Sequence, residues 1–144
     1  MPETVNQAYI FVPMMVVVFL TFIALFRMGA ARGTAMKAGQ DPNYYKAQLG
    51  DPEPESTVAA VRHFNILFEA PTLFYAGCIA AYVLQAVNFW TVVFAWGFVI
   101  LRLIQSAVHL TYNNPAHRGG AFMASMLFLL ALWIQLAIAV CALL

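Results

Sequence analysis

The chain has 144 residues, of which 63% are hydrophobic and 9% are charged, and its net charge is +1. A soluble domain carries about 25% charged residues, so this chain has too few of them to cover a water-facing surface. The composition excludes a soluble enzyme, a disordered regulator and a general nucleic-acid binder. Long apolar runs instead predict an integral membrane protein of the all-α class, a four-helix bundle forming one domain over residues 1–144.

Uncharged runs locate the four predicted membrane-spanning helices. The second and third come from one uncharged run, residues 70–101, which is too long for a single span and is divided by a turn near Gln85 and Asn88. Ser56 and Asn114 are the predicted N-caps of the second and fourth helices. The predicted spans are 5–27, 56–84, 89–112 and 116–143.

The first connection, residues 28–55, is long and polar. Asp41 followed by Pro42 is typical of a helix start and Gly50 of a helix end, so a short helix is predicted between them. Its tyrosines are placed to rest on the membrane interface. The acids of this connection, and Glu3 near the N-terminus, are predicted to lie on a solvated surface.

Basic residues predict the topology. Arg27, Arg32, Lys37 and Lys46 lie in or beside the first connection and Arg118 lies in the third, whereas the termini and the turn near residue 88 have none. By the positive-inside rule, loops 28–55 and 113–118 are cytoplasmic and both termini lie outside.

Polar side chains also occur where the spans should face lipid. Arg62, Asn65 and Glu69 follow one another at i, i+3 and i+7, so they share an arc of about 60° on the second helix. Arg118 falls in the first turn of the fourth helix. The third helix repeats the pattern with Arg102, Gln105, Ser106, His109 and Asn113.

The topology places these groups in one half of the membrane. Glu69 and Arg102 are predicted at one depth, about 16–20 Å from their helix ends. They should pair, because either charge alone costs at least about 2.5–3.5 kcal/mol at the bilayer centre. For any single one of these polar residues, a structural role in an ion pair or an interhelical hydrogen bond is as good an explanation as a functional role. The excess of Arg62, Arg102, Arg118 and His109 over one acid nevertheless predicts a shared pocket for a small anion.

The other candidate side chains are given structural roles. His63 lies in line with apolar residues and is predicted to pack against a neighbour. Cys78 and Cys141 are predicted to be buried packing thiols, and no metal site is predicted. A bis-histidine haem protein using His63 and His109 is a further alternative, although the two residues are expected on mismatched faces.

The segment from Arg62 to Pro71, RHFNILFEAP, together with Arg102 and Arg118, resembles the MAPEG superfamily of membrane-associated proteins in eicosanoid and glutathione metabolism. The resemblance covers residues 56–133 and is nearest to bacterial members. It implies a homotrimer, in a bacterial inner membrane, that holds glutathione between neighbouring subunits at the cytoplasmic side. It further implies contact with membrane lipids and a lipophilic small-molecule substrate.

The resemblance also implies individual roles. Arg62, Asn65 and Glu69 would bind glutathione, Arg102 would brace Glu69, and Arg118 would stabilise the glutathione thiolate as the catalytic residue. His109 and Asn113 are further candidate glutathione contacts on the third helix. The implied activity is that of a glutathione-dependent transferase or peroxidase acting on a lipophilic electrophile or a lipid hydroperoxide.

The sequence departs from the better-known eukaryotic members at several positions. Asn65 and Glu69 are four residues apart instead of three, Gln105 and His109 replace tyrosines, and Phe122 stands where one branch has a tyrosine. A non-catalytic lipid-binding or scaffolding protein of the same fold is therefore an open alternative. A small proton-coupled transporter is a less favoured one, since Glu69 is expected to be paired.

Overall fold

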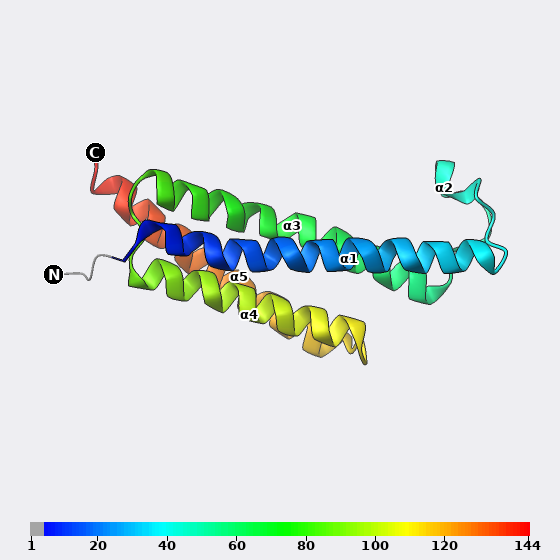
Figure 1. Ribbon diagram of the computed structural model, residues 1–144. Coiled ribbons are helices and arrows are strands. Elements are labelled where there is room, and N and C mark those ends of the chain that lie inside the picture. Colours follow the sequence, from blue (N-terminus) through cyan, green and yellow to red (C-terminus); the bar gives the residue numbers. More distant parts are fainter. Residues whose placement is uncertain (1–4) are drawn as a thin grey trace.

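The computed structural model describes residues 5–144, and these residues fold almost entirely into helices (Figure 1). Glu3, which is predicted to lie on a solvated surface, falls outside this range. In chain order the elements are a 3₁₀ turn η1 Gln7–Ile10 and the helices α1 Phe11–Lys37, α2 Tyr44–Ala47, α3 Glu55–Val83, α4 Phe89–Leu110 and α5 Pro115–Cys141. α3, α4, α5 and the unit of η1 with α1 are long and apolar enough to cross a membrane. The prediction of an all-α, four-helix membrane protein is confirmed.

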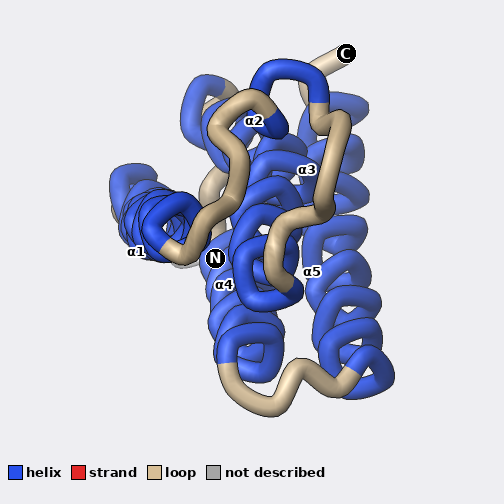
Figure 2. The backbone as a smooth tube through the Cα atoms, turned by 90° about the vertical axis from the view of Figure 1, so that its right-hand side faces the viewer, coloured by secondary structure: helices blue, strands red, loops and turns tan. Residues whose placement is uncertain are grey.

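The helices pack as two antiparallel pairs, α1 with α3 and α4 with α5. Figure 2 shows α1 nearly end-on beside the other helices. The core is aromatic and aliphatic at its centre, where the rings of Phe74 and Phe98 stack with centroids 4.5 Å apart. Gly77 and Gly97 sit where a neighbouring side chain comes too close for a Cβ atom, and this allows α5 to approach both α3 and α4.

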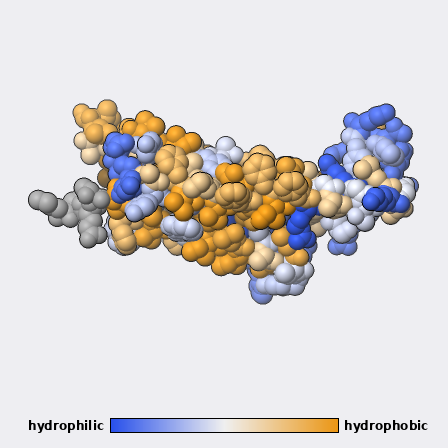
Figure 3. All heavy atoms as spheres, in the orientation of Figure 1, coloured by the Kyte–Doolittle hydropathy of each residue, from blue (hydrophilic) through white to orange (hydrophobic). Residues whose placement is uncertain are grey.

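α1 is longer than predicted, because it continues past Arg27 to Lys37. The added residues have no proline and are rich in alanine, so nothing in them stops a helix. The helix ends just before Gly39, whose φ of 104° suits glycine. α1 and the start of α3 thus project beyond the connection between α4 and α5 (Figure 1), and this projecting end is hydrophilic (Figure 3).

The turns at the helix ends are fixed by side-chain hydrogen bonds. Asn88 and Thr91 form a reciprocal capping box at the start of α4, after a turn in which Gln85 has a φ of 53°. Asn114 caps α5 as predicted, accepting from two backbone N–H groups of its first turn. The prediction that Ser56 caps α3 is wrong, because α3 already begins at Glu55 after Pro54 and has no side-chain cap.

The predicted short helix exists as α2, Tyr44–Ala47, and ends at Gln48 with a φ of 55°. The connection that carries it is fastened to α1. Arg32 forms an ion pair of 3.4 Å with Glu53 and lies over the ring of Tyr45. The Glu53 side chain is only 7% exposed, so its predicted place on a solvated surface is wrong. Desolvation and the Glu53 carboxylate raise the pKa of Tyr45 above its ordinary value.

Large apolar side chains cover the outside of the four long helices, as in Phe19, Trp90 and Leu127. In a soluble protein such a surface would drive aggregation, but it suits contact with lipid or with other membrane helices. Cys78 is buried as predicted, whereas Cys141 is exposed because it lies in the last turn of α5.

Candidate functional site

The polar face of α3 forms one candidate site. Arg62, Asn65 and Glu69 are exposed and line a single cavity of about 360 Å³, so the structure places them together as their spacing predicts. The opposite wall comes from the first connection, where Tyr44, Gln48 and Glu53 line the same cavity. Sequence reasoning missed these three residues. Their only signal was the short helix itself, since nothing local in the sequence indicates that the connection folds back over α3.

A second cluster joins the end of α4 to the start of α5. Arg118 donates from Nη1 to Asn113 Oδ1 at 2.9 Å and to His109 Nδ1 at 3.1 Å. His109 Nε2 in turn lies 2.9 Å from the carbonyl oxygen of Ala59 on α3. Asn113 reaches Arg118 from a backbone turn with a φ of 45°. The structure thus brings together three predicted site residues, His109, Asn113 and Arg118.

This cluster borders a further cavity of about 400 Å³. His109 and Asn113 line it from α4 and the connection that follows, and Glu55 and Ala59 line it from the start of α3. Arg27, on the outer part of α1, lines it as well. The cavity therefore lies at the end of the bundle where the polar connections gather, and its wall carries both a guanidinium and a carboxylate.

Arg102 occupies the core of the bundle and is 1% exposed. It donates from Nη1 to Gln105 Oε1 at 2.9 Å, and its guanidinium lies 5.1 Å from the ring centroid of Phe98 and 4.9 Å from that of Phe122. Its Nε and Nη2 atoms have no hydrogen-bond partner within residues 5–144. Phe122 stands at a position where a tyrosine is found in one branch of the resembling family, and here it packs on a buried cation.

The predicted pair between Glu69 and Arg102 is wrong for this chain. The ion pair between Arg32 and Glu53 is the only one among the described residues. The physical reason is direction: Glu69 is exposed on the outer face of α3, whereas Arg102 is enclosed between the rings of Phe98 and Phe122. Equal depth on two helices is therefore not sufficient to bring their charged groups into contact.

His63 and His109 are not on mismatched faces, because their rings stack with centroids 5.1 Å apart. His63 is 4% exposed, and its Nε2 lies 2.9 Å from Ser106 Oγ, which agrees with a packing role. The Nε2 atoms of both histidines are engaged within the protein, and the direct ring contact leaves no gap for a porphyrin. The geometry does not support the haem alternative.

The predicted shared pocket for three arginines is not formed within the single chain. Arg62 lines the α3 cavity, Arg118 is bound to His109 and Asn113, and Arg102 is enclosed in the core. Helical periodicity grouped the residues of each helix correctly, but it could not determine which way each guanidinium turns. Neither of the two cavities described above is lined by both Arg62 and Arg118.

The sequence model of the MAPEG family matches residues 10–138, nearly the whole described chain. The chain belongs to the MAPEG family. No curated protein and no solved structure matches it. Membership places this MAPEG protein among the integral membrane proteins of glutathione and eicosanoid metabolism. The four apolar helices of the fold agree with that assignment and with contact between the MAPEG chain and membrane lipids.

Proposed function

We propose that this MAPEG protein is a glutathione-dependent membrane transferase or peroxidase acting on a lipophilic electrophile or lipid hydroperoxide. The observation that carries the proposal is the exposed face of α3, where Arg62, Asn65 and Glu69 line one cavity although they belong to a membrane-spanning helix. Ionisable side chains are rare in membrane-spanning segments, because the free-energy cost of exposing a charge to lipid is high. Where they occur, they usually mark a functional site.

The donor set suits a small zwitterionic peptide. Arg62 offers a guanidinium for a carboxylate, Asn65 an amide that both donates and accepts, and Glu69 a carboxylate for an ammonium group. Glu53 adds a second carboxylate across the same cavity, whose volume of about 360 Å³ is within the range of about 300–1,000 Å³ for small-molecule sites. Arg62 can therefore bind one of the two carboxylates of glutathione and Glu69 its ammonium group. Glu53, in contrast, is neutralised by Arg32, and the second carboxylate needs a cation from outside this cavity.

Arg118 is the proposed catalytic residue. Both hydrogens on its Nη1 are directed at His109 and Asn113, while its Nη2 and Nε make no hydrogen bond within residues 5–144. The half-buried guanidinium is thus held on one side and available to an anion on the other. Bound glutathione would supply the sulfur nucleophile. A cation beside a thiol with a pKa near 8.5 favours its anionic form, and lowering that pKa by about two corresponds to about 2.7 kcal/mol.

Assembly would complete the site. Arg62 and Glu69 are exposed on α3 in the single chain, and Arg118 is bonded in a second cluster at the start of α5. A homotrimer that holds glutathione between subunits would cover the α3 face of one copy with the Arg118 cluster of the next. The proposed orientation has both termini outside and the polar connections in the cytoplasm of a bacterium, with the chain in the inner membrane.

Titration calorimetry of the detergent-solubilised protein with glutathione tests the proposal. We expect binding in the micromolar to millimolar range, accompanied by the ultraviolet absorbance of a thiolate. Arg118→Ala should abolish the thiolate absorbance, while Phe19→Ala on the exposed apolar surface of α1 should not. Absence of binding at millimolar glutathione, or an unchanged thiolate signal in Arg118→Ala, would reject the proposal.

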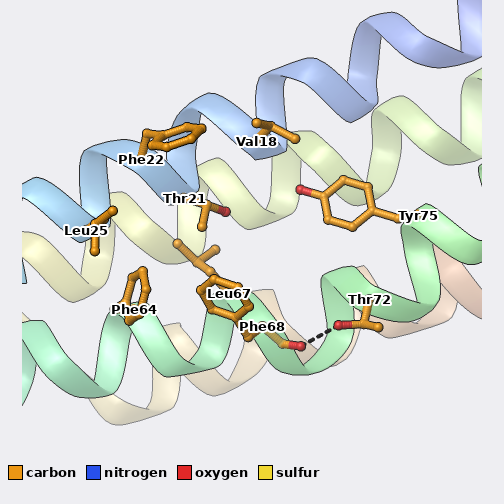
Figure 4. Close-up of a pocket in the computed structure, with 9 residues that line it drawn as sticks. All are labelled: Val18, Thr21, Phe22, Leu25, Phe64, Leu67, Phe68, Thr72 and Tyr75. Carbon is orange, nitrogen blue, oxygen red and sulfur yellow. Dashed lines mark hydrogen bonds between the residues drawn. The ribbon is translucent and has the colours of Figure 1, made fainter.

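A non-catalytic, lipid-binding protein of the same fold is the second candidate. It is favoured by an apolar groove of about 370 Å³ between α1 and α3, whose lining includes Val18, Phe22, Leu67 and Phe68 (Figure 4). The Tyr75 hydroxyl also faces this groove (Figure 4). Lipid that co-purifies and exchanges with labelled fatty acid, in a protein that gives no thiolate signal with glutathione, would favour this function over the first.

A further inference from the structure

The imidazole of His109 connects two helices through its two nitrogen atoms. Nε2 lies 2.9 Å from the Ala59 carbonyl oxygen of α3, and Nδ1 lies 3.1 Å from Nη1 of Arg118 on α5. A carbonyl oxygen only accepts and a guanidinium only donates. The network therefore assigns a neutral imidazole with its hydrogen on Nε2 and a lone pair on Nδ1 that faces Arg118.

The ring that carries these two bonds is firmly held. His109 is 5% exposed, and it stacks on His63, which is itself anchored through Nε2 to Ser106 Oγ at 2.9 Å. The His109 ring therefore cannot turn without breaking its hydrogen bond to Ala59 of α3, its hydrogen bond to Arg118 or its stacking on His63. A side chain fixed in this way sets the position of the group to which it bonds.

Arg118 by itself has little to hold it. It lies in the first turn of α5, and its other protein contact is Asn113, an exposed residue of the connection before that helix. An arginine side chain loses much of its rotamer freedom when it is fixed. A buried, immobile acceptor in the bundle wall offsets this cost before any ligand arrives.

We propose that His109 is a positioning residue that aims the guanidinium of Arg118 at the ligand, and is not itself a contact of the ligand. This inference rests on the proposed function. It differs from the expectation that His109 binds glutathione, because both ring nitrogens are already occupied by protein atoms. In this arrangement Nη1 is used for positioning and Nη2 and Nε remain for the anion.

Two substitutions separate the two bonds of the imidazole. Asn places an acceptor oxygen at the δ position, where Nδ1 faces Arg118, but it cannot reach Ala59. Gln places a donor nitrogen at the ε position, where Nε2 faces Ala59, but it has no acceptor at the δ position. His109→Asn therefore preserves the contact to Arg118, and His109→Gln preserves the contact to α3. His117→Ala, next to Arg118 but bonded to the Tyr112 hydroxyl, is the matched control.

The readouts are the glutathione Kd from calorimetry and the pH at which the bound thiol ionises, followed by thiolate absorbance. We expect His109→Gln to raise the pKa of the bound thiol by about one. At a pH below that pKa, the thiolate fraction should then be roughly tenfold smaller than in wild type. The glutathione Kd should stay within about twofold of wild type. His109→Asn should shift the pKa less, and His117→Ala should not shift it. A structural loss alone would lower the folded fraction without moving this pKa.

Three results would overturn the inference while leaving the proposed function standing. The first is a bound thiol in His109→Gln that has the same pKa as in wild type. The second is an equal shift of that pKa in both His109 variants. The third is a glutathione Kd that rises about tenfold in both variants with no shift of the pKa, as expected if His109 contacts the ligand directly. If wild-type protein binds glutathione without forming a thiolate, or does not bind it, the proposed function fails and this inference fails with it. Failure of the wild-type protein rejects the proposed function, whereas an unexpected result in the His109 variants alone rejects only the positioning role.

Discussion

Arg102 and Gln105, one turn apart on α4, bond to each other through Nη1 and Oε1 at 2.9 Å in the core of the bundle. Two of the arginine's nitrogen atoms remain without a partner among the described residues, and the rings of Phe98 and Phe122 flank the guanidinium. The cation is thus stabilised by one amide and two aromatic faces, with the nearest carboxylate of α3 turned outward. This relationship, and not an ion pair, defines the role of Arg102 in the single chain.

A double-mutant cycle on stability checks this arrangement. Arg102→Met and Gln105→Leu should couple by about 0.5–3 kcal/mol, because each single change leaves the other polar group buried and unpaired. Arg102→Met and Glu69→Gln should couple more weakly, because no ion pair joins these two side chains within residues 5–144 and only a longer-range attraction between their charges remains. Unfolding of each variant in mixed detergent micelles gives these free energies. The reverse order of the two couplings would show that Arg102 pairs with Glu69 after all.

The polar face of α3 makes a prediction about affinity. Arg62→Ala and Glu69→Gln should each raise the glutathione Kd about tenfold or more, because a hydrogen bond to a charged group contributes about 1.5–3 kcal/mol. Phe68→Ala is the control, since Phe68 is exposed on the same helix but lines the apolar groove. Calorimetry measures all three. Equal effects at Phe68 and Arg62 would mean that the loss comes from α3 as a whole and not from its polar face.

Local chemistry in the sequence predicted much of this fold. The four spans follow from uncharged runs, the cap at Asn114 from the Asn-Pro pair, and the shared face of Arg62, Asn65 and Glu69 from helical periodicity. These features depend on neighbours within a few residues, so a sequence is sufficient to find them.

The features that the sequence did not predict depend on contacts between distant segments. Glu53 is buried because Arg32, twenty-one positions earlier, pairs with it. Arg102 turns into the core because Phe122 of the next helix offers its ring, and His109 meets Ala59 across fifty residues. Periodicity gives the face of a helix on which a residue lies, but the rotamer and the partner are decided by packing.

Close packing between α4 and α5 predicts a strong effect at one glycine. A Cβ atom at Gly97 would overlap the ring of Phe128, so Gly97→Ala should destabilise the protein by about 1–3 kcal/mol. Gly29→Ala on α1 is the control, because nothing lies within 4 Å of its Cβ position and alanine favours a helix by up to about 1 kcal/mol. Thermal unfolding in detergent should give a lower Tm for Gly97→Ala than for wild type, and an unchanged or higher Tm for Gly29→Ala. Equal Tm values would mean that Phe128 moves aside without loss.

The geometry of Arg118 makes the final prediction. Arginine serves His109 and Asn113 from one nitrogen while its other nitrogens stay free, whereas lysine has a single nitrogen for all partners. Arg118→Lys should therefore keep part of the thiolate signal and Arg118→Gln should lose it, although both should bind glutathione within about tenfold of wild type. In a pH titration of absorbance, the pKa of the bound thiol should rise from wild type to lysine to glutamine, because less positive charge faces the sulfur. A lysine variant identical to wild type would show that charge alone is enough, and a glutamine variant with a full signal would place the stabilising cation elsewhere.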